Sequence, residues 1–248
     1  MSRPKVVASI EARMGSSRLP GKVLEDIHGR PALSRLLERL RQCQQLNDIV
    51  LATSVAPADD ALEAWAKSEQ VAYYRGSEDD VLHRVVNAHR QMESEVIVEV
   101  TGDCTMLDPD VIDQAIETYF ANDADVVANV DPLSYPMGVD VQVFGFGLLA
   151  KVEETIHETA VREHVSIHFY RNPDRFRLIR LIAPHELRRP ELRFQLDYPE
   201  DLKFLREVYG KLLPIHGNHF RTRHILELLD KHPELVMINR DCEETVVA

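Results

Sequence analysis

The hydrophobic pattern of the chain alternates between the period of strands and the period of helices. Short apolar runs that we interpret as strands lie at residues 6–10, 49–53, 71–74 and 96–101. Stretches whose apolar residues recur every three or four positions, as in amphipathic helices, lie at residues 31–40, 59–66 and 81–92. Because strands and helices alternate in this way, the sequence predicts an α/β fold with a doubly wound, mostly parallel sheet.

The pattern changes from Tyr135 onward. Valines at 139, 141 and 143 alternate with other residues in the period of a half-exposed strand. The remaining predictions are helices over 110–120, 147–154, 158–169, 200–209 and 221–229, strands over 125–130, 176–183 and 194–196, and a peripheral segment over 234–248. We therefore predict a single domain over residues 1–248 that contains a small β-containing insert.

Composition narrows the class of protein. The chain is 44% hydrophobic and 28% charged, as one globular domain usually is, and its formal net charge is −12. Nucleic-acid binders carry a basic surface that neutralises phosphates, so we expect no nucleic-acid partner. No apolar run reaches the roughly 20 residues of a membrane helix, and no signal peptide is visible. Three separated cysteines support neither a disulfide framework nor a zinc site, so we expect a cytoplasmic protein without a membrane partner.

The strongest candidate for chemistry is the stretch that follows the first strand, Glu11–Lys22. Open α/β sheets bind ligands at such strand ends. The stretch offers the cations Arg13, Arg18 and Lys22, and the backbone amides of 15–17 carry no bulky side chains. These features predict a polyphosphate site.

Two well-known phosphate loops do not fit this stretch. A Walker loop has four residues between its glycines and a hydroxyl after its lysine, whereas five residues separate Gly15 from Gly21 and Val23 follows Lys22. The glycine spacing of the dinucleotide fingerprint is missing too. A P-loop nucleotidase and a Rossmann dehydrogenase are therefore disfavoured.

Two aspartates follow predicted strands. Asp103 ends the strong strand at 96–101, and Asp197 follows the predicted strand at 194–196. Both carboxylates can then lie at one crevice, where they would suit Mg²⁺, which prefers hard oxygen ligands. The alternative is that Asp103 is a turn residue and Asp197 a helix N-cap.

Several segments, taken together, resemble the cytidylyltransferase family of the spore-coat polysaccharide (SpsF) type. The resemblance spans roughly residues 5–210 and rests on the segments Ala12–Lys22, Arg75–Arg84, Thr101–Cys104, Leu107–Pro109, Pro136–Asp140, Arg162–Val165 and Leu196–Leu202. That family is related to the CMP-sugar-acid synthetases and has the nucleotide-diphospho-sugar transferase fold. One departure is Thr105, where the family usually has proline.

The resemblance implies roles for individual residues. Arg13 and Lys22 match triphosphate contacts, and Asp103 and Asp197 match the aspartates that hold Mg²⁺; we predict these four residues to be catalytic. The predicted nucleotide contacts are Ala12, Gly15, Ser16, Arg18, Thr53, Arg75 and Ser77. Acceptor contacts are expected from Gly138, Asp140, His164 and Arg193. For Arg84, a structural pair with Asp79 and a ligand contact both stay open.

The predicted activity is transfer of CMP from CTP to a sugar acid, a phosphorylated sugar or a phosphonate, with release of pyrophosphate. The partners would be CTP and a small anionic acceptor, and relatives imply a homodimer. The insert at about 131–192 would serve acceptor binding and dimerisation. Three alternatives stay open: a sugar-1-phosphate nucleotidylyltransferase that uses UTP or GTP, a glycosyltransferase that consumes a nucleotide-sugar, and a regulatory relative without activity.

Overall fold

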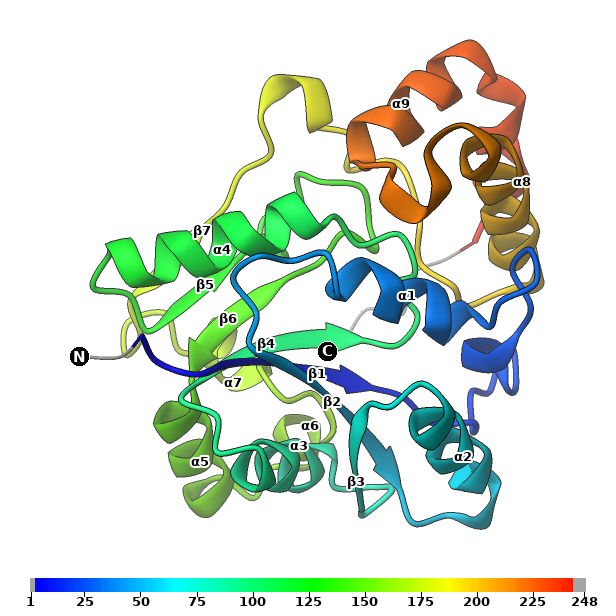
Figure 1. The fold of residues 1–248 in the computed structure, drawn as a ribbon. Helices are drawn as coiled ribbons and strands as arrows, with labels where there is room; N and C mark the ends of the chain where they lie inside the picture. The colour runs from blue at the N-terminus through cyan, green and yellow to red at the C-terminus, as the bar shows by residue number, and fades with distance from the viewer. Residues whose placement is uncertain (1–2, 243–248) are drawn as a thin grey trace.

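The computed structural model describes residues 3–242, which form a mixed sheet with helices on both faces (Figure 1). The sheet has seven strands in the order β3-β2-β1-β4-β6-β5-β7. The strands are β1 (Val6–Glu11), β2 (Asp48–Ser54), β3 (Ala72–Gly76), β4 (Val96–Thr101), β5 (Val126–Ala128), β6 (Gln142–Gly145) and β7 (Leu178–Arg180). All neighbours pair in parallel except β6, which is antiparallel to β4 and to β5. The predicted α/β, mostly parallel fold is confirmed.

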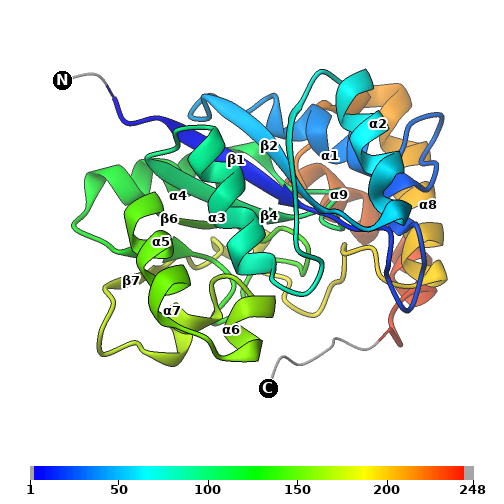
Figure 2. The same cartoon turned by 90° about the horizontal axis from the view of Figure 1, so that it is seen from below.

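The helices divide between the two faces of the sheet. One face is covered by α3 (Val81–Gln91), α5 (Phe146–Thr155), α6 (Thr159–Glu163) and α7 (Ile167–Arg171), as Figure 2 shows from below. The other face is covered by α1 (Ala32–Leu40), α2 (Asp60–Ser68) and α4 (Pro109–Ala121), with α8 (Pro199–His216) and α9 (Thr222–Lys231) packed beyond them.

The central strands are apolar because each face meets a different core. In β1, Val6, Ala8 and Ile10 belong to the cluster that includes α1, whereas Val7 belongs to the cluster that includes α3. A strand buried on both faces needs a continuous apolar run, which is why β1, β2 and β4 could be predicted from the sequence.

The second half of the chain differs from the prediction in several places. The helix expected over 158–169 is two short helices, α6 and α7, and the strand expected over 176–183 is reduced to β7. Residues 194–196 form no strand; Phe194 N–H donates to the Met137 carbonyl at 2.7 Å, and Leu196 N–H donates to the Asp103 carbonyl at 3.0 Å. These long-range contacts hold an extended segment against the end of β4.

The C-terminal segment is less peripheral than predicted. A 3₁₀ helix at Pro233–Ile238 packs on α8 and α9, and Leu235 is buried. Asn239 is buried too and donates to the Arg193 carbonyl at 3.1 Å. Residues 243–248 lie outside the described part of the chain.

Part of the insert, including strand β6, lies inside the sheet. Its strand β6 lies between β4 and β5 inside the sheet, so residues 136–146 offer little surface to a second copy of the chain. A homodimer therefore stays a prediction, and the expected contact over 158–170 falls on α6 and α7. Within residues 3–242, no helix is long and apolar enough to cross a bilayer.

Candidate active site

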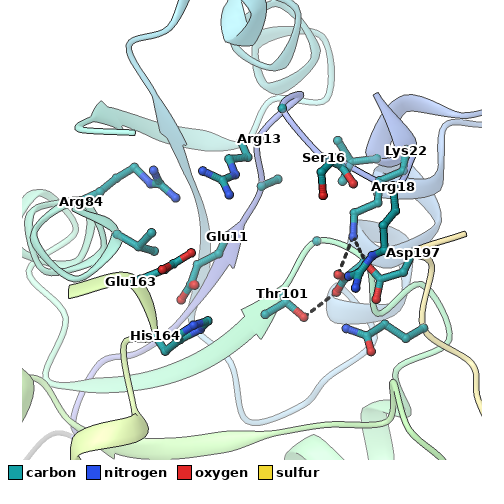
Figure 3. A pocket seen from close by; sticks show the side chains of 18 residues that line it. Glu11, Arg13, Ser16, Arg18, Lys22, Arg84, Thr101, Glu163, His164 and Asp197 are labelled. Carbon is teal, nitrogen blue, oxygen red and sulfur yellow. Dashed lines mark hydrogen bonds and ion pairs between the residues drawn. The ribbon is translucent and has the colours of Figure 1, made fainter. Parts of the chain in front are cut away.

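A cavity of about 380 Å³ opens at the carboxyl ends of β1 and β4 (Figure 3). Its walls come from the loop after β1, the end of β4, the start of α3, the end of α6 and the segment before α8. The lining side chains include Arg13, Ser16, Arg18, Lys22, Thr101, Asp103, His164 and Asp197. The cavity thus brings together the cationic loop and both aspartates, which are far apart in the sequence.

The loop after β1 is fixed by contacts at both of its ends. Met14 N–H donates to Asp59 Oδ1 at 2.7 Å, and the second oxygen of Asp59 accepts from Ser54 Oγ at 2.5 Å. The buried Asp59 therefore ties the loop to the end of β2 and makes no side-chain cap on α2. Gly21 closes the loop at φ 74°, where glycine is strongly favoured, and its N–H donates to the Met14 carbonyl at 3.0 Å.

A second glycine allows the two central strands to end side by side. A Cβ atom on Gly102 would lie 2.9 Å from Ala12 Cβ and 3.1 Å from the Glu11 carbonyl oxygen. Gly102 N–H donates to that carbonyl at 2.8 Å. The close approach places Asp103 directly across from the loop.

Lys22 joins the two aspartates. Its Nζ lies 2.7 Å from Asp103 Oδ2 and 2.8 Å from Asp197 Oδ1, and Arg18 Nη2 lies 2.8 Å from the same Asp197 oxygen. Burial alone would raise the pKa of Asp197, but Lys22 and Arg18 lower it below the usual value. Burial alone would lower the pKa of Lys22, but Asp103 and Asp197 raise it. Lys22 and Asp197 are therefore both charged at neutral pH.

Asp197 is positioned by a buried arginine. Arg193 Nη2 donates to Asp197 Oδ2 at 2.8 Å, while its Nε donates to Asp201 at 3.0 and 3.2 Å. Asp201 also accepts from the backbone N–H groups of Asp197 and Tyr198. Arg193 was expected to contact the acceptor, but its guanidinium faces these carboxylates and does not line the cavity.

The two aspartates have the donor set that suits a magnesium ion. Their oxygens converge on one cation position, now shared with Lys22 Nζ, and carboxylates are the protein ligands that Mg²⁺ prefers. Residues 3–242 contain no cluster of three or more histidine, cysteine or acidic side chains placed to hold a metal. A metal bound here would take its other ligands from water and phosphate, as Mg²⁺ usually does.

The other end of the cavity carries Glu11 and Glu163, which the sequence analysis did not select, and Arg84, whose role it left open. His164 and Arg13 line this end as well (Figure 3). Burial raises the pKa of the Glu11 carboxyl to about 7, although Arg84 opposes the shift. Glu11 could have been recognised as an acidic residue that ends an apolar strand just before the loop.

Several predicted site residues lie outside the cavity. Thr53 is fully buried in β2, and Ser77 Oγ accepts from the Asp80 N–H at 3.1 Å at the start of α3. Arg75 binds the carbonyls of Ser54 and Ala56 at 2.9 Å each and also pairs with two acidic side chains, those of Asp60 and Glu63. The structure gives Arg75 a role in joining β3 to α2.

The predicted acceptor residues divide in the same way. His164 lines the cavity, whereas Gly138 and Asp140 do not. Gly138 has φ 93°, and a Cβ atom there would lie 2.7 Å from Gln195 N, so this position supports the segment before Asp197. Asp140 Oδ2 accepts from the Gly138 N–H at 3.1 Å.

The pair between Arg84 and Asp79 that the sequence left open does not form. Arg84 Nη1 instead donates to the carbonyls of Ser77 and Glu78 at 2.8 and 3.4 Å. The neighbouring Asp80 takes Arg162 as its partner, at 2.5 Å. That pair fastens α6 to α3 and so holds His164 at the cavity wall.

Known proteins resemble this chain over most of its length. A family described as cytidylyltransferase matches residues 7–226. The spore coat polysaccharide biosynthesis protein SpsF of Bacillus subtilis (strain 168) is 33% identical over 207 residues, which cover 82% of this chain and 85% of that protein. A solved cytidylyltransferase structure from Leptospira borgpetersenii serovar Hardjo-bovis (strain JB197) is similar with a TM-score of 0.89 and 26% identity, over 98% of this chain and 100% of that one.

A more distant structure shares the fold. It is CMP:2-keto-3-deoxy-manno-octonic acid synthetase complexed with CTP, with a TM-score of 0.62 and 18% identity over 84% of this chain and 99% of that one.

Proposed function

Because the chain belongs to the cytidylyltransferase family, we propose that it transfers CMP from CTP to a small anionic acceptor and releases pyrophosphate. The single observation that carries this proposal is the contact of Lys22, at the end of the loop after β1, with both Asp103 and Asp197. A nucleotidyl transfer needs cations for the triphosphate and carboxylates for a divalent metal at one place, and this site supplies both.

The loop residues would hold the triphosphate. Arg13, Arg18 and Lys22 line the same cavity and match the charge of the nucleotide phosphates. Gly15 and Ser16 place backbone and hydroxyl donors between them. Held in this way, the α-phosphorus is presented to the acceptor oxygen for in-line attack.

Asp103 and Asp197 would hold Mg²⁺, which supplies charge neutralisation and orientation at the phosphates when it is bound. Thr101 Oγ1 donates to Asp103 Oδ1 at 2.7 Å, and Arg193 holds Oδ2 of Asp197, so the two oxygens that face Lys22 keep their direction. In the reaction, the acceptor oxygen forms a bond to the α-phosphorus, the bond from that phosphorus to the bridging oxygen of pyrophosphate breaks, and the hydroxyl proton leaves to solvent.

We propose a sugar acid as the acceptor, with a phosphorylated sugar or a phosphonate as the alternatives to be tested. SpsF is named for polysaccharide biosynthesis, and the related fold in the CTP complex belongs to a synthetase of a CMP-sugar acid. His164 and Gln195 both line the cavity and are the acceptor contacts that we propose.

Pyrophosphate release tests the proposal. Purified protein with Mg²⁺ would be incubated with each of the four nucleoside triphosphates and a panel of sugar acids, sugar phosphates and phosphonates. We expect release with CTP and at least one acceptor, and its loss in Asp103→Asn. Release with only UTP or GTP would favour a sugar-1-phosphate nucleotidylyltransferase and contradict the use of CTP.

A further inference from the structure

The end of the cavity away from Asp197 contains a carboxyl group and a guanidinium that form no ion pair with each other. Glu11 extends into it from β1 and Arg84 from α3 (Figure 3). Their charges influence each other, yet among the described residues no ion pair joins them. A carboxylate and a guanidinium that share a cavity without touching leave room for a ligand between them.

Arg84 is buried but not fully satisfied. Its side chain is only 2% exposed, and Nη1 is fixed by the carbonyls of Ser77 and Glu78. Its Nε finds no hydrogen-bond acceptor among residues 3–242. A buried guanidinium with an open donor is costly unless a bound molecule supplies the acceptor.

In the described part of the chain, one oxygen of Glu11 lacks a hydrogen-bond donor, just as Nε of Arg84 lacks an acceptor. The oxygen is the buried Oε1, and the neighbouring Glu99, which is 6% exposed, has an Oε2 in the same condition. Within residues 3–242, the side chain of Glu99 accepts from Ser166 Oγ alone, at 3.4 Å. A buried carboxyl oxygen without a donor suits a ligand group that offers N–H donors.

A cytosine ring meets both needs along one edge. Its 4-amino group donates, and its ring N3 and carbonyl O2 accept; carboxylates are known partners of that amino group, and arginine forms bidentate pairs with two acceptors. We propose that Glu11 accepts from the 4-amino group of cytosine and Arg84 donates to N3 and O2, which makes Glu11 the residue that selects CTP over UTP. This inference rests on the proposed function and adds the means by which the base is chosen.

Uracil would be rejected at the same position. It carries a carbonyl oxygen where cytosine carries the amino group, so the Glu11 oxygen would face another hydrogen-bond acceptor. The Glu11 oxygen and the uracil oxygen would then both lose their bound water without gaining a hydrogen bond. A glutamine side chain has nearly the same shape but can present either its carbonyl or its amide N–H groups. Glu11→Gln should therefore accept both bases.

The test is titration calorimetry of CTP and UTP, each with Mg²⁺, on the wild-type protein, Glu11→Gln and the control Glu154→Gln. Glu154 is exposed on α5 and does not line the cavity. We expect Glu11→Gln to weaken CTP binding and strengthen UTP binding, so that the affinity ratio falls by about tenfold or more, the size of one charged hydrogen bond. The control should keep the wild-type ratio.

The outcomes separate the two proposals. A general structural defect in Glu11→Gln would weaken both nucleotides together and leave their ratio unchanged; that result overturns the assignment of Glu11 but not the use of CTP. A wild-type protein that binds neither nucleotide, or UTP as well as CTP, would overturn the selection proposed here, and the absence of CTP binding would overturn the proposed function with it.

Discussion

Replacing Glu11 by glutamine should stabilise the protein at high pH. Burial raises the pKa of this carboxyl from 4.5 to about 7, so the folded chain binds more protons than the unfolded chain between those values. Wild-type stability therefore falls as the pH rises through that window. The difference between these two pKa values sets an upper limit of about 3 kcal/mol on the gain. Because Glu11 is half-buried, we expect about 1–2 kcal/mol.

Urea denaturation at pH 5 and pH 8 measures the effect. The free energy of unfolding of Glu11→Gln should exceed that of the wild-type protein at pH 8, and the difference should be small at pH 5, where Glu11 is protonated in the folded state. Glu154→Gln controls for the loss of one acidic side chain at an exposed position. An equal difference at both pH values would refute the reasoning, because only a titrating carboxylate makes the gain depend on pH.

Three further variants test the rest of the site. Lys22→Met removes a largely buried cation that contacts two carboxylates. It should lower the free energy of unfolding by about 3 kcal/mol and reduce the rate of pyrophosphate release at least tenfold. Unchanged denaturation curves would contradict this prediction. Asp201→Asn weakens the hydrogen bonds that Asp201 accepts from Arg193 and from the Asp197 N–H, so Asp197 should move. We expect kcat to fall by a larger factor than the KM for CTP rises. A change in KM alone would argue against a positioning role for Asp201. Arg75→Gln should cost about 2 kcal/mol of stability and leave calorimetric CTP affinity within about twofold, whereas a large loss of affinity would restore its predicted contact with the nucleotide.

The sequence predicted the parts of the fold that local patterns control. Strands β1, β2 and β4 are buried on both faces, so their apolar runs are continuous and easy to recognise. The segment at 194–196 was mistaken for a strand because its apolar residues pack in the core, although its backbone is held by Met137 and Asp103 from elsewhere in the chain. Pairing with distant segments leaves no periodic signal in a stretch of three residues.

The same distinction applies to the site. Lys22 and Asp103 could be selected because they follow strands that end at one edge of the sheet, whereas Asp197 was selected after a strand that does not form; the structure places both aspartates in contact with Lys22. The direction of Arg75 could not be foreseen, since it is set by acidic residues on α2 that lie beside it only in the folded chain. Glu11 was overlooked because its unusual feature is burial beside Glu99, which depends on strand pairing.

The central claim is that the loop after β1 and the two aspartates form one nucleotide site. A crystal structure with CTP and Mn²⁺ in place of Mg²⁺ tests it directly, because the anomalous signal of manganese locates the metal. We predict a peak between Asp103 and Asp197, with the triphosphate along 13–22 and Lys22 Nζ moved toward the phosphates. Nucleotide bound elsewhere, or manganese remote from both aspartates, would contradict the mechanism even though the fold would stand.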